Sequence, residues 1–249
     1  DAEVDELAHL VAARVEGDEE VRRLDVAVHE PLPVDGGERL AHLDPEANRV
    51  VDRQIPRMEK IQVTLVRLAR HQFGVGKACA VIAGGEVKAR YAKCHLPNYG
   101  VFDEFRNFVA GDSTLVVRIH GVDVGIAICE DLWIDGGISA QLAARNPGLV
   151  IVPNGSPYER NKDDVRLNLV TRRAREAKAP LVYVNMTGGQ DDLVFDGDSI
   201  VVNPDGSVIA RAPQFEDGVM VVDIDVTPAT SEPDVIISDD SVVIDKPLI

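Results

Sequence analysis

Hydrophobic residues along this chain alternate with polar ones in short runs, or form short continuous apolar runs. A period of two and brief apolar runs are both typical of β-strands. Glycine-containing turns separate several neighbouring runs and predict hairpins over 78–92, 115–128 and 199–210. The strands predicted in this way cover residues 24–28, 78–82, 87–92, 115–119, 122–128, 149–153, 181–186, 199–203, 207–210 and 219–226.

Apolar residues at three-four spacing predict fewer helices, over residues 4–15, 56–70, 138–145 and 161–177. Strands outnumber helices and hairpins dominate, which indicates an α+β fold built around a mixed sheet. The chain shows no internal repeat and no firm boundary before Thr227, where a tail rich in Pro, Ser and Asp begins. We therefore expect one domain over residues 1–226, followed by an acidic tail or the start of a linker over 227–249.

The composition narrows the class of protein. The chain has 249 residues, of which 45% are hydrophobic and 27% charged, as in ordinary globular domains. No apolar run is long enough to span a membrane, and the acidic N-terminus lacks the features of a secretory signal. The first residue is not Met, so we expect a fragment or a processed product. The net charge of −16 argues against a nucleic-acid partner, because a phosphate backbone requires a basic surface.

The thiols and acids do not form a recognisable metal or disulfide pattern. The three cysteines are far apart and lack a paired-Cys motif, which argues against a disulfide framework and a Cys-type zinc site. Free thiols fit a reducing cytoplasm, where we expect the protein to be located. Glu130 and Asp131 have no His at ligand spacing, so no metal is expected there.

Cys129 is the most informative residue, because the apolar strand over 122–128 ends directly before it. A rigid strand behind a thiol and a turn in front suit a nucleophile. Lys93 stands at the end of the strand over 87–92. A thiol and an amine at the ends of neighbouring strands suggest covalent chemistry on a carbon–nitrogen bond. By residue type alone, a buried structural thiol remains the alternative.

Four stretches, which cover residues 91–104, 127–133, 154–158 and 188–199, resemble the nitrilase (carbon–nitrogen hydrolase) superfamily and occur in its order. They look most like the glutaminase domain of bacterial glutamine-dependent NAD synthetases. The resemblance extends from about residue 80 to 225. It implies a four-layer α-β-β-α sandwich and a site made of Glu, Lys and Cys.

In that site the resemblance makes Cys129 the nucleophile and Lys93 its neighbour. An ammonium beside a thiol favours the thiolate and can stabilise an oxyanion. The family places a general-base Glu in a Phe-Pro-Glu context followed by Thr-Gly-Tyr, which is absent here. Glu30, at the end of the predicted strand over 24–28, is the nearest counterpart; otherwise it is an ordinary loop acid. Residues 1–75 are atypical of the family.

The resemblance implies further contacts around the same pocket. Glu104 matches a second Glu that positions the Lys amine, and its alternative is a surface acid. Tyr99, Ser156 and Lys162 match positions that bind glutamine. A hydroxyl, a phenol and a cation suit the ammonium and carboxylate of an amino acid. The alternative for Lys162 is a solvated lysine in the first turn of a helix.

The resemblance implies a glutamine amidohydrolase that supplies ammonia for NAD synthesis through a Cys thioester. No cofactor is expected in this domain, and ATP and Mg are expected only in a fused or partner synthetase domain. We further expect a small amide as substrate, a homo-oligomer, and neither nucleic acid nor membrane as partner. Two alternatives remain open at this point: a free-standing amidase acting on another small amide, and a catalytically inactive amidase fold that binds a partner.

Overall fold

The computed structural model describes the backbone over residues 6–16, 22–34, 61–66, 77–83, 86–160, 162–190, 192–218 and 220–238. Side chains are described over residues 77–83, 86–160, 165–189, 192–218 and 220–238. All statements below refer to these parts of the chain.

A six-stranded sheet has the order β14-β2-β1-β3-β4-β5, and every neighbouring pair in it is antiparallel. Its strands β4 and β5 form the predicted glycine hairpin, and their register pairs Ala78 with Ala92. The hairpin brings the chain to Lys93. The strands of this sheet are β1 (Glu6–Glu16), β2 (Arg22–Val34), β3 (Ile61–Val66), β4 (Ala78–Ala83), β5 (Glu86–Ala92) and β14 (Met220–Val226).

A seven-stranded mixed sheet has the order β13-β12-β9-β8-β7-β6-β15. The central strands β7, β8 and β9 are parallel, while the β6–β7 and β12–β13 pairs are antiparallel hairpins, as predicted. Parallel central strands are buried on both faces, which explains their continuous apolar runs. The strands are β6 (Leu115–Ile119), β7 (Val122–Ile126), β8 (Leu149–Asn154), β9 (Leu181–Asn185), β12 (Ile200–Val202), β13 (Val208–Arg211) and β15 (Val235–Ile236).

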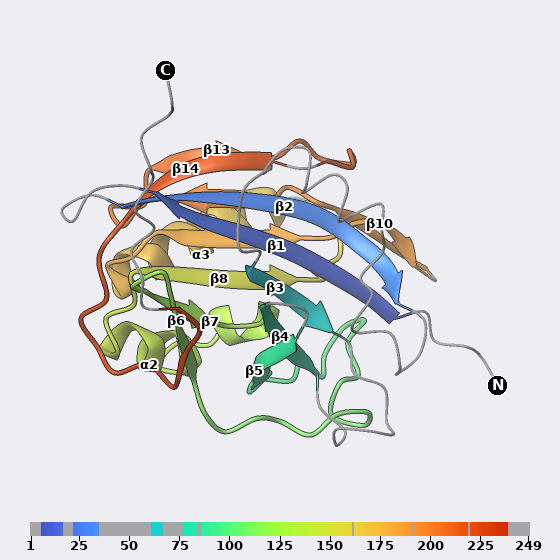
Figure 1. Cartoon of the computed structure of the whole chain (residues 1–249). Helices are drawn as coiled ribbons and strands as arrows, with labels where there is room; N and C mark the ends of the chain where they lie inside the picture. Colours follow the sequence, from blue (N-terminus) through green and yellow to red (C-terminus); the bar gives the residue numbers. More distant parts are fainter. Residues whose placement is uncertain are drawn as a thin grey trace.

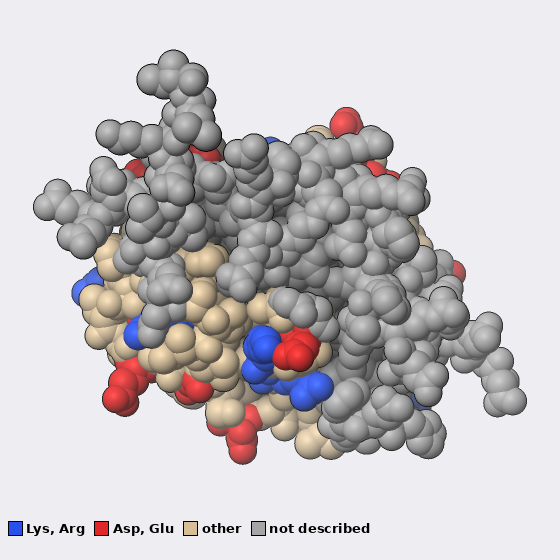
Figure 2. Space-filling model, viewed as in Figure 1, with Lys and Arg blue, Asp and Glu red and all other residues tan. Residues whose placement is uncertain are grey.

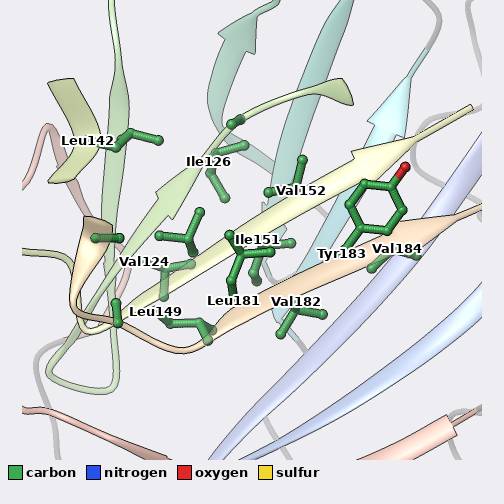
Figure 3. Packing of buried hydrophobic residues seen from close by; sticks show 14 of the residues in the cluster. Val124, Ile126, Leu142, Leu149, Ile151, Val152, Leu181, Val182, Tyr183 and Val184 are labelled. Carbon is green, nitrogen blue, oxygen red and sulfur yellow. The ribbon is translucent and has the colours of Figure 1, made fainter. Parts of the chain in front are cut away.

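The core lies where the two sheets face each other and continues beneath the helices. Buried residues of β4, β5 and β14 belong to the same hydrophobic cluster as those of β6–β9. The helices α2 (Ile138–Ala144) and α3 (Lys162–Ala177) pack against each other, and α3 contacts β9 and β12. Figure 1 shows β8 between β1 and β2 on one side and α2 on the other. Figure 3 shows the side chains of β7, β8 and β9 packed with Leu142 of α2. The described residues therefore form two sheets with helices on one outer face.

Two predictions near the N-terminus were wrong, and a third was correct in type but too short. The segment predicted as a helix over 4–15 forms β1, and β3 occupies the middle of the helix predicted over 56–70. The strand predicted over 24–28 extends to Val34. The apolar spacing over residues 4–15 and 56–70 fits a helix. However, β1 pairs with β2 and β3 pairs with β4, and these pairings supply the backbone hydrogen bonds. Such tertiary context overrides local propensity.

Two further elements were not predicted. Thr187–Gln190 (β10) and Leu193–Asp196 (β11) form a two-stranded hairpin where no strand was predicted. The short strand β15 pairs with β6 in parallel. Neither segment carries enough apolar residues to show a period of two, so both depend on their partners.

The residues after Thr227 run along β6 as far as Ser238. Asp234 accepts hydrogen bonds from the backbone N–H of Val116 and from Arg145, at 2.7 and 2.6 Å. Ser231 donates to the buried carboxylate of Asp123, which Arg118 also contacts. Acidic side chains thus hold part of this segment against the sheet, a role that composition alone does not reveal.

Charged side chains of both signs are interspersed on the surface. On the face shown in Figure 2, described Lys and Arg side chains lie in small groups, some of them next to Asp or Glu, and do not form one continuous basic area. Within the ranges that the structure describes, no helix combines the length and the apolar character needed to cross a membrane.

Candidate active site

The Cys129 thiol stands on a sharp turn between a strand and a short helix. Strand β7 ends at Ile126, and the 3-10 helix η1 (Cys129–Leu132) begins at the cysteine itself. Cys129 has a φ of +45°, a left-handed conformation that non-glycine residues rarely adopt. Such strain clusters at functional sites, where surrounding contacts hold it in place. The cysteine is only 7% exposed, yet it lines a cavity. It is therefore not a thiol enclosed on all sides by hydrocarbon.

The carboxylate of Asp131 fixes this turn to the end of β5. One oxygen accepts hydrogen bonds from the backbone N–H groups of Cys94 and His95, at 3.1 and 2.8 Å. The other accepts from the Tyr91 hydroxyl at 2.7 Å and from the N–H of Ile128 at 3.1 Å. Asp131 is fully buried.

Two of the residues that Asp131 joins are chain neighbours of Lys93 and Cys129. Cys94 follows Lys93, and Ile128 precedes Cys129. Burial and the Asp131 charge raise the pKa of Tyr91, so its hydroxyl stays a donor. One buried carboxylate thereby sets the position of Lys93 relative to the thiol.

Lys93 is completely buried and forms an ion pair with Glu104 at 2.7 Å. The second oxygen of Glu104 pairs with Lys77, also at 2.7 Å. Burial, followed by the charge of Lys93, lowers the pKa of Lys77, and Glu104 and Cys129 oppose that change. The charges of Lys77 and Cys129 therefore lie close enough to interact. Two amines and a carboxylate thus form one cluster, and Lys77 in this cluster interacts electrostatically with Cys129.

The cavity in front of Cys129 has a volume of about 380 Å³, which suits a small organic molecule. The Tyr99 hydroxyl donates to both oxygens of Glu130, at 2.9 and 3.0 Å. Burial and the Glu130 carboxylate raise the pKa of Tyr99, so the phenol stays protonated. The cavity lining combines aromatic, charged and small polar residues: Tyr99, Phe102, Cys129, Glu130, Trp133, Ser156, Glu159, Arg160 and Val165.

Buried polar contacts position the loop that carries Ser156. The backbone N–H of Ser156 donates to the Asn185 side chain at 2.8 Å, and the Asn185 amide donates back to the Ser156 carbonyl at 3.2 Å. Arg166 of α3 binds both oxygens of Asp196, each at 2.7 Å, and is fully buried. Burial opposes the charge of Arg166, but the bonds to Asp196 raise its pKa. Strand β9 and helix α3 therefore hold the loop whose Ser156 lines the cavity.

The structure brings together most of the site residues predicted from the sequence. Cys129, Tyr99 and Ser156 line one cavity, and Lys93 and Glu104 form a buried pair at the strand end that Asp131 ties to the Cys129 turn. The side chains of the other two, Glu30 and Lys162, lie outside the described part of the chain.

The predicted position of Glu30 needs a correction. Glu30 does not end its strand, because β2 continues to Val34. The residue lies instead at an irregularity in the pairing of β1 with β2, between His29 and Leu32. A bulge inserts an extra residue and re-aims the side chains around it.

Sequence reasoning missed several residues of the site. Glu130 was considered only as a metal ligand, and Glu159 and Arg160 were not singled out, although all three line the cavity. Their nearness to Cys129 and Ser156 in the chain was the available signal. Lys77 was also missed. The register of the predicted hairpin over 78–92 places it opposite Lys93, which could have identified it.

The comparison with protein families places the described geometry in a known context. Residues 67–231 match the model of a family described as carbon-nitrogen hydrolase. The match confirms the resemblance predicted from the four sequence stretches. A glutamine-dependent NAD(+) synthetase of Aquifex aeolicus is 39% identical over 185 residues, which are 74% of this chain and 33% of that protein. One from Rhodobacter capsulatus is 46% identical over 154 residues, or 62% of this chain and 28% of that protein. The chain thus spans about a third of the length of these relatives.

Solved structures show the same similarity. A glutamine-dependent NAD+ synthetase from Acinetobacter baumannii, in complex with ADP, has a TM-score of 0.61 and 32% identity, over 81% of this chain and 40% of that chain. An amidase from Nesterenkonia sp. AN1 has a TM-score of 0.53 and 32% identity, over 60% of this chain and 55% of that chain. In that mutant amidase the acetamide moiety of fluoroacetamide is covalently added at the active site cysteine.

Proposed function

The chain belongs to the carbon–nitrogen hydrolase family, and from this premise we propose that it hydrolyses the side-chain amide of glutamine through a thioester on Cys129. One observation carries the proposal: the thiol stands on a strained turn and lines a cavity, and Asp131 ties this turn to the strand end that carries the buried Lys93–Glu104 pair. The names of the similar proteins support the choice of glutamine as the amide.

In the proposed reaction the Cys129 thiolate adds to the amide carbon of the substrate, and the carbonyl oxygen becomes an oxyanion. The buried ammonium of Lys93 and backbone N–H groups of the η1 turn stabilise this charge, because donors in a dry site act strongly. The carbon–nitrogen bond then breaks, and the nitrogen leaves as ammonia after gaining a proton. Water adds to the thioester, the carbon–sulfur bond breaks, and glutamate is released.

The cavity contains charges that fit an amino-acid substrate. Arg160 can pair with the α-carboxylate, since a guanidinium matches a carboxylate in geometry. Glu130 and Glu159 can accept hydrogen bonds from the α-ammonium, while Tyr99 orients Glu130. Lys162, at the start of α3, remains a predicted contact. Both ends of the amino acid would then be held while the amide points at Cys129.

The general base is proposed to be a carboxylate, and Glu30 remains the predicted one. It would take the thiol proton, pass it to the leaving ammonia and later activate water. The ammonia would serve a synthetase domain or subunit that carries ATP and Mg, in a homo-oligomer in the cytoplasm. A further helical layer over the outer face of the six-stranded sheet would complete the four-layer sandwich.

Glutamine hydrolysis and labelling of Cys129 test this function together. Wild-type protein is expected to release ammonia from glutamine, and Cys129→Ala to abolish release without loss of stability. Cys94→Ala is the matched control, because Cys94 is a half-buried thiol that does not line the cavity. A glutamine-like electrophile is expected to label Cys129 alone. Glutaminase activity that survives in Cys129→Ala would refute the assignment.

A panel of small amides separates the proposed function from its alternatives. Faster ammonia release from an aliphatic amide than from glutamine would favour the free-standing amidase, which the likeness to the Nesterenkonia amidase motivates. Failure of every electrophile to label Cys129 would favour an inactive, partner-binding fold.

A further inference from the structure

We propose that Lys77 is a second cation of the active site, which works with Lys93 through Glu104 to set the pH range in which Cys129 is reactive. The proposal rests on the proposed function, in which Cys129 is the nucleophile. Lys77 is a positioning residue in this scheme, since it acts through Glu104 and through its charge and does not line the cavity.

The backbone makes Lys77 and Lys93 cross-strand neighbours. The β4–β5 register pairs Ala78 with Ala92, and the next pair outward is Lys77 with Lys93. The N–H of Lys93 donates to the carbonyl of Lys77 at 2.8 Å, which extends the ladder by this pair. Directly opposed side chains point to the same face of a sheet, and like charges in that position repel. An uncompensated lysine pair here would therefore be unfavourable.

Glu104 resolves that repulsion by giving one carboxylate oxygen to each amine, both at 2.7 Å. The side chain of Glu104 is 7% exposed, that of Lys93 is 0% exposed and that of Lys77 is 21% exposed. All three charged groups are thus largely shielded from water. Charges interact more strongly in the protein interior than in water. Lys77, Glu104 and Lys93 therefore form one cluster of three charged side chains.

The charge count of this cluster is the central argument. Lys93 and Glu104 alone would sum to zero, so that a thiolate nearby would gain little net attraction. Lys77 leaves one net positive charge, which a thiolate on Cys129 would balance. Burial and Lys93 lower the pKa of Lys77, so this extra charge is held less firmly than on a free lysine. Lys77 thereby couples the reactivity of Cys129 to pH.

Several other ionisable groups face Cys129 and must be held constant in any test. Tyr99 and Tyr183 interact electrostatically with the sulfur, and both stay protonated because burial raises the pKa of each. The neighbouring elements contribute further ionisable side chains: Lys93 after β5, Glu104 in the following loop, Glu130 and Asp131 in η1, Glu159 and Arg160 after β8, and Arg166 in α3. Lys77 can be altered without touching the cavity lining.

The test is the rate of Cys129 alkylation by iodoacetamide between pH 5 and 10, followed by mass spectrometry of the Cys129 peptide. Iodoacetamide is neutral, so the charge of Lys77 does not attract or repel the reagent. The alkylation rate therefore reflects how much of Cys129 is thiolate. Lys77→Gln keeps a hydrogen-bonding group for Glu104 and removes the charge. We expect the half-maximal pH of alkylation to rise by about one unit, so that the rate near pH 7 falls roughly tenfold, with the high-pH plateau unchanged.

Two further variants decide the interpretation. Lys77→Arg keeps the charge and is expected to restore the wild-type profile. Lys88→Met is the matched control, because this lysine is exposed on β5 and pairs only with Glu86 among the described contacts. The proposal is overturned when the Lys77→Gln profile superimposes on wild type, or when Lys77→Arg or Lys88→Met shifts the profile as far as Lys77→Gln does. An equal plateau in every variant verifies that the site is folded.

The two proposals fail in different ways. Absence of ammonia release from glutamine, with a Lys77-dependent alkylation profile, would refute the substrate and leave the cation cluster standing. Normal glutaminase activity with a Lys77-independent profile would refute the cluster and leave the substrate standing.

Discussion

Replacement of Asp131 by Asn tests whether one carboxylate sets the geometry of the site. The carboxylate accepts four hydrogen bonds, from the Cys94, His95 and Ile128 backbone N–H groups and from the Tyr91 hydroxyl, and the His95 ring nitrogen Nδ1 lies 3.1 Å from the oxygen that faces Cys94 and His95. An amide has one accepting oxygen and one donating nitrogen. The oxygen is best placed toward Cys94 and His95, whose N–H groups cannot turn away.

The nitrogen of the new amide then faces Tyr91 and Ile128. The tyrosine hydroxyl can rotate and accept a hydrogen bond, but the Ile128 N–H loses its acceptor in a buried place. One orphaned buried donor costs about 1–3 kcal/mol, and the remaining bonds lose charge assistance, so we expect a total destabilisation of about 3 kcal/mol. Ile128, whose N–H would lose its acceptor, directly precedes Cys129 in the chain. A shift of the thiol by about 1 Å is expected to lower turnover roughly 100-fold.

Urea denaturation of wild type and Asp131→Asn measures the first effect, and the rate of ammonia release from glutamine measures the second. Asp223→Asn is the matched control, because Asp223 is exposed on β14. We expect the control to stay within about 0.5 kcal/mol of wild type. An Asp131→Asn protein as stable as the control would show that the four hydrogen bonds do not hold the turn.

Three further perturbations probe other contacts. Arg166→Met should cost about 3–5 kcal/mol in urea denaturation because it leaves Asp196 buried without its partner, and a smaller loss in the double variant with Asp196→Leu would support that cause. Burial opposes ionisation of Asp123, but Arg118 and the hydrogen bonds from Ser231 together outweigh it and lower the Asp123 pKa below the usual 3.8. Its stabilisation is therefore present above that value and lost as pH falls below it, so thermal melting of Asp123→Asn should depend less on pH between 2 and 5 than that of wild type. Gly111→Ala would place a methyl group against a carbonyl oxygen of β5 and should cost about 1–3 kcal/mol; unchanged melting would contradict this packing.

The hairpins and the buried parallel strands could be predicted from the sequence because their signals are local. The glycine turn after Ala83 and the apolar runs of β7, β8 and β9 appear directly in the order of residues. Cys129 and Lys93 could be found in the same way, since each follows the end of such a run.

The N-terminal strands could not be predicted in this way. Residues 4–15 and 56–70 carry apolar spacing that suits a helix, but β1 and β3 pair with each other and with strands distant in the chain. An extended segment gains its hydrogen bonds from partners, and a single sequence does not show which partners are near.

The sequence by itself determined the family, because four of its stretches resemble that family, and it predicted Cys129 as the nucleophile and Lys93 as its amine from their places at strand ends. The tertiary structure alone decided that Asp131 ties the two strand ends together and that Lys77 shares Glu104 with Lys93. Such links join residues far apart in the chain, and their strength comes from burial, which removes competing water and exists only after the sheets have packed.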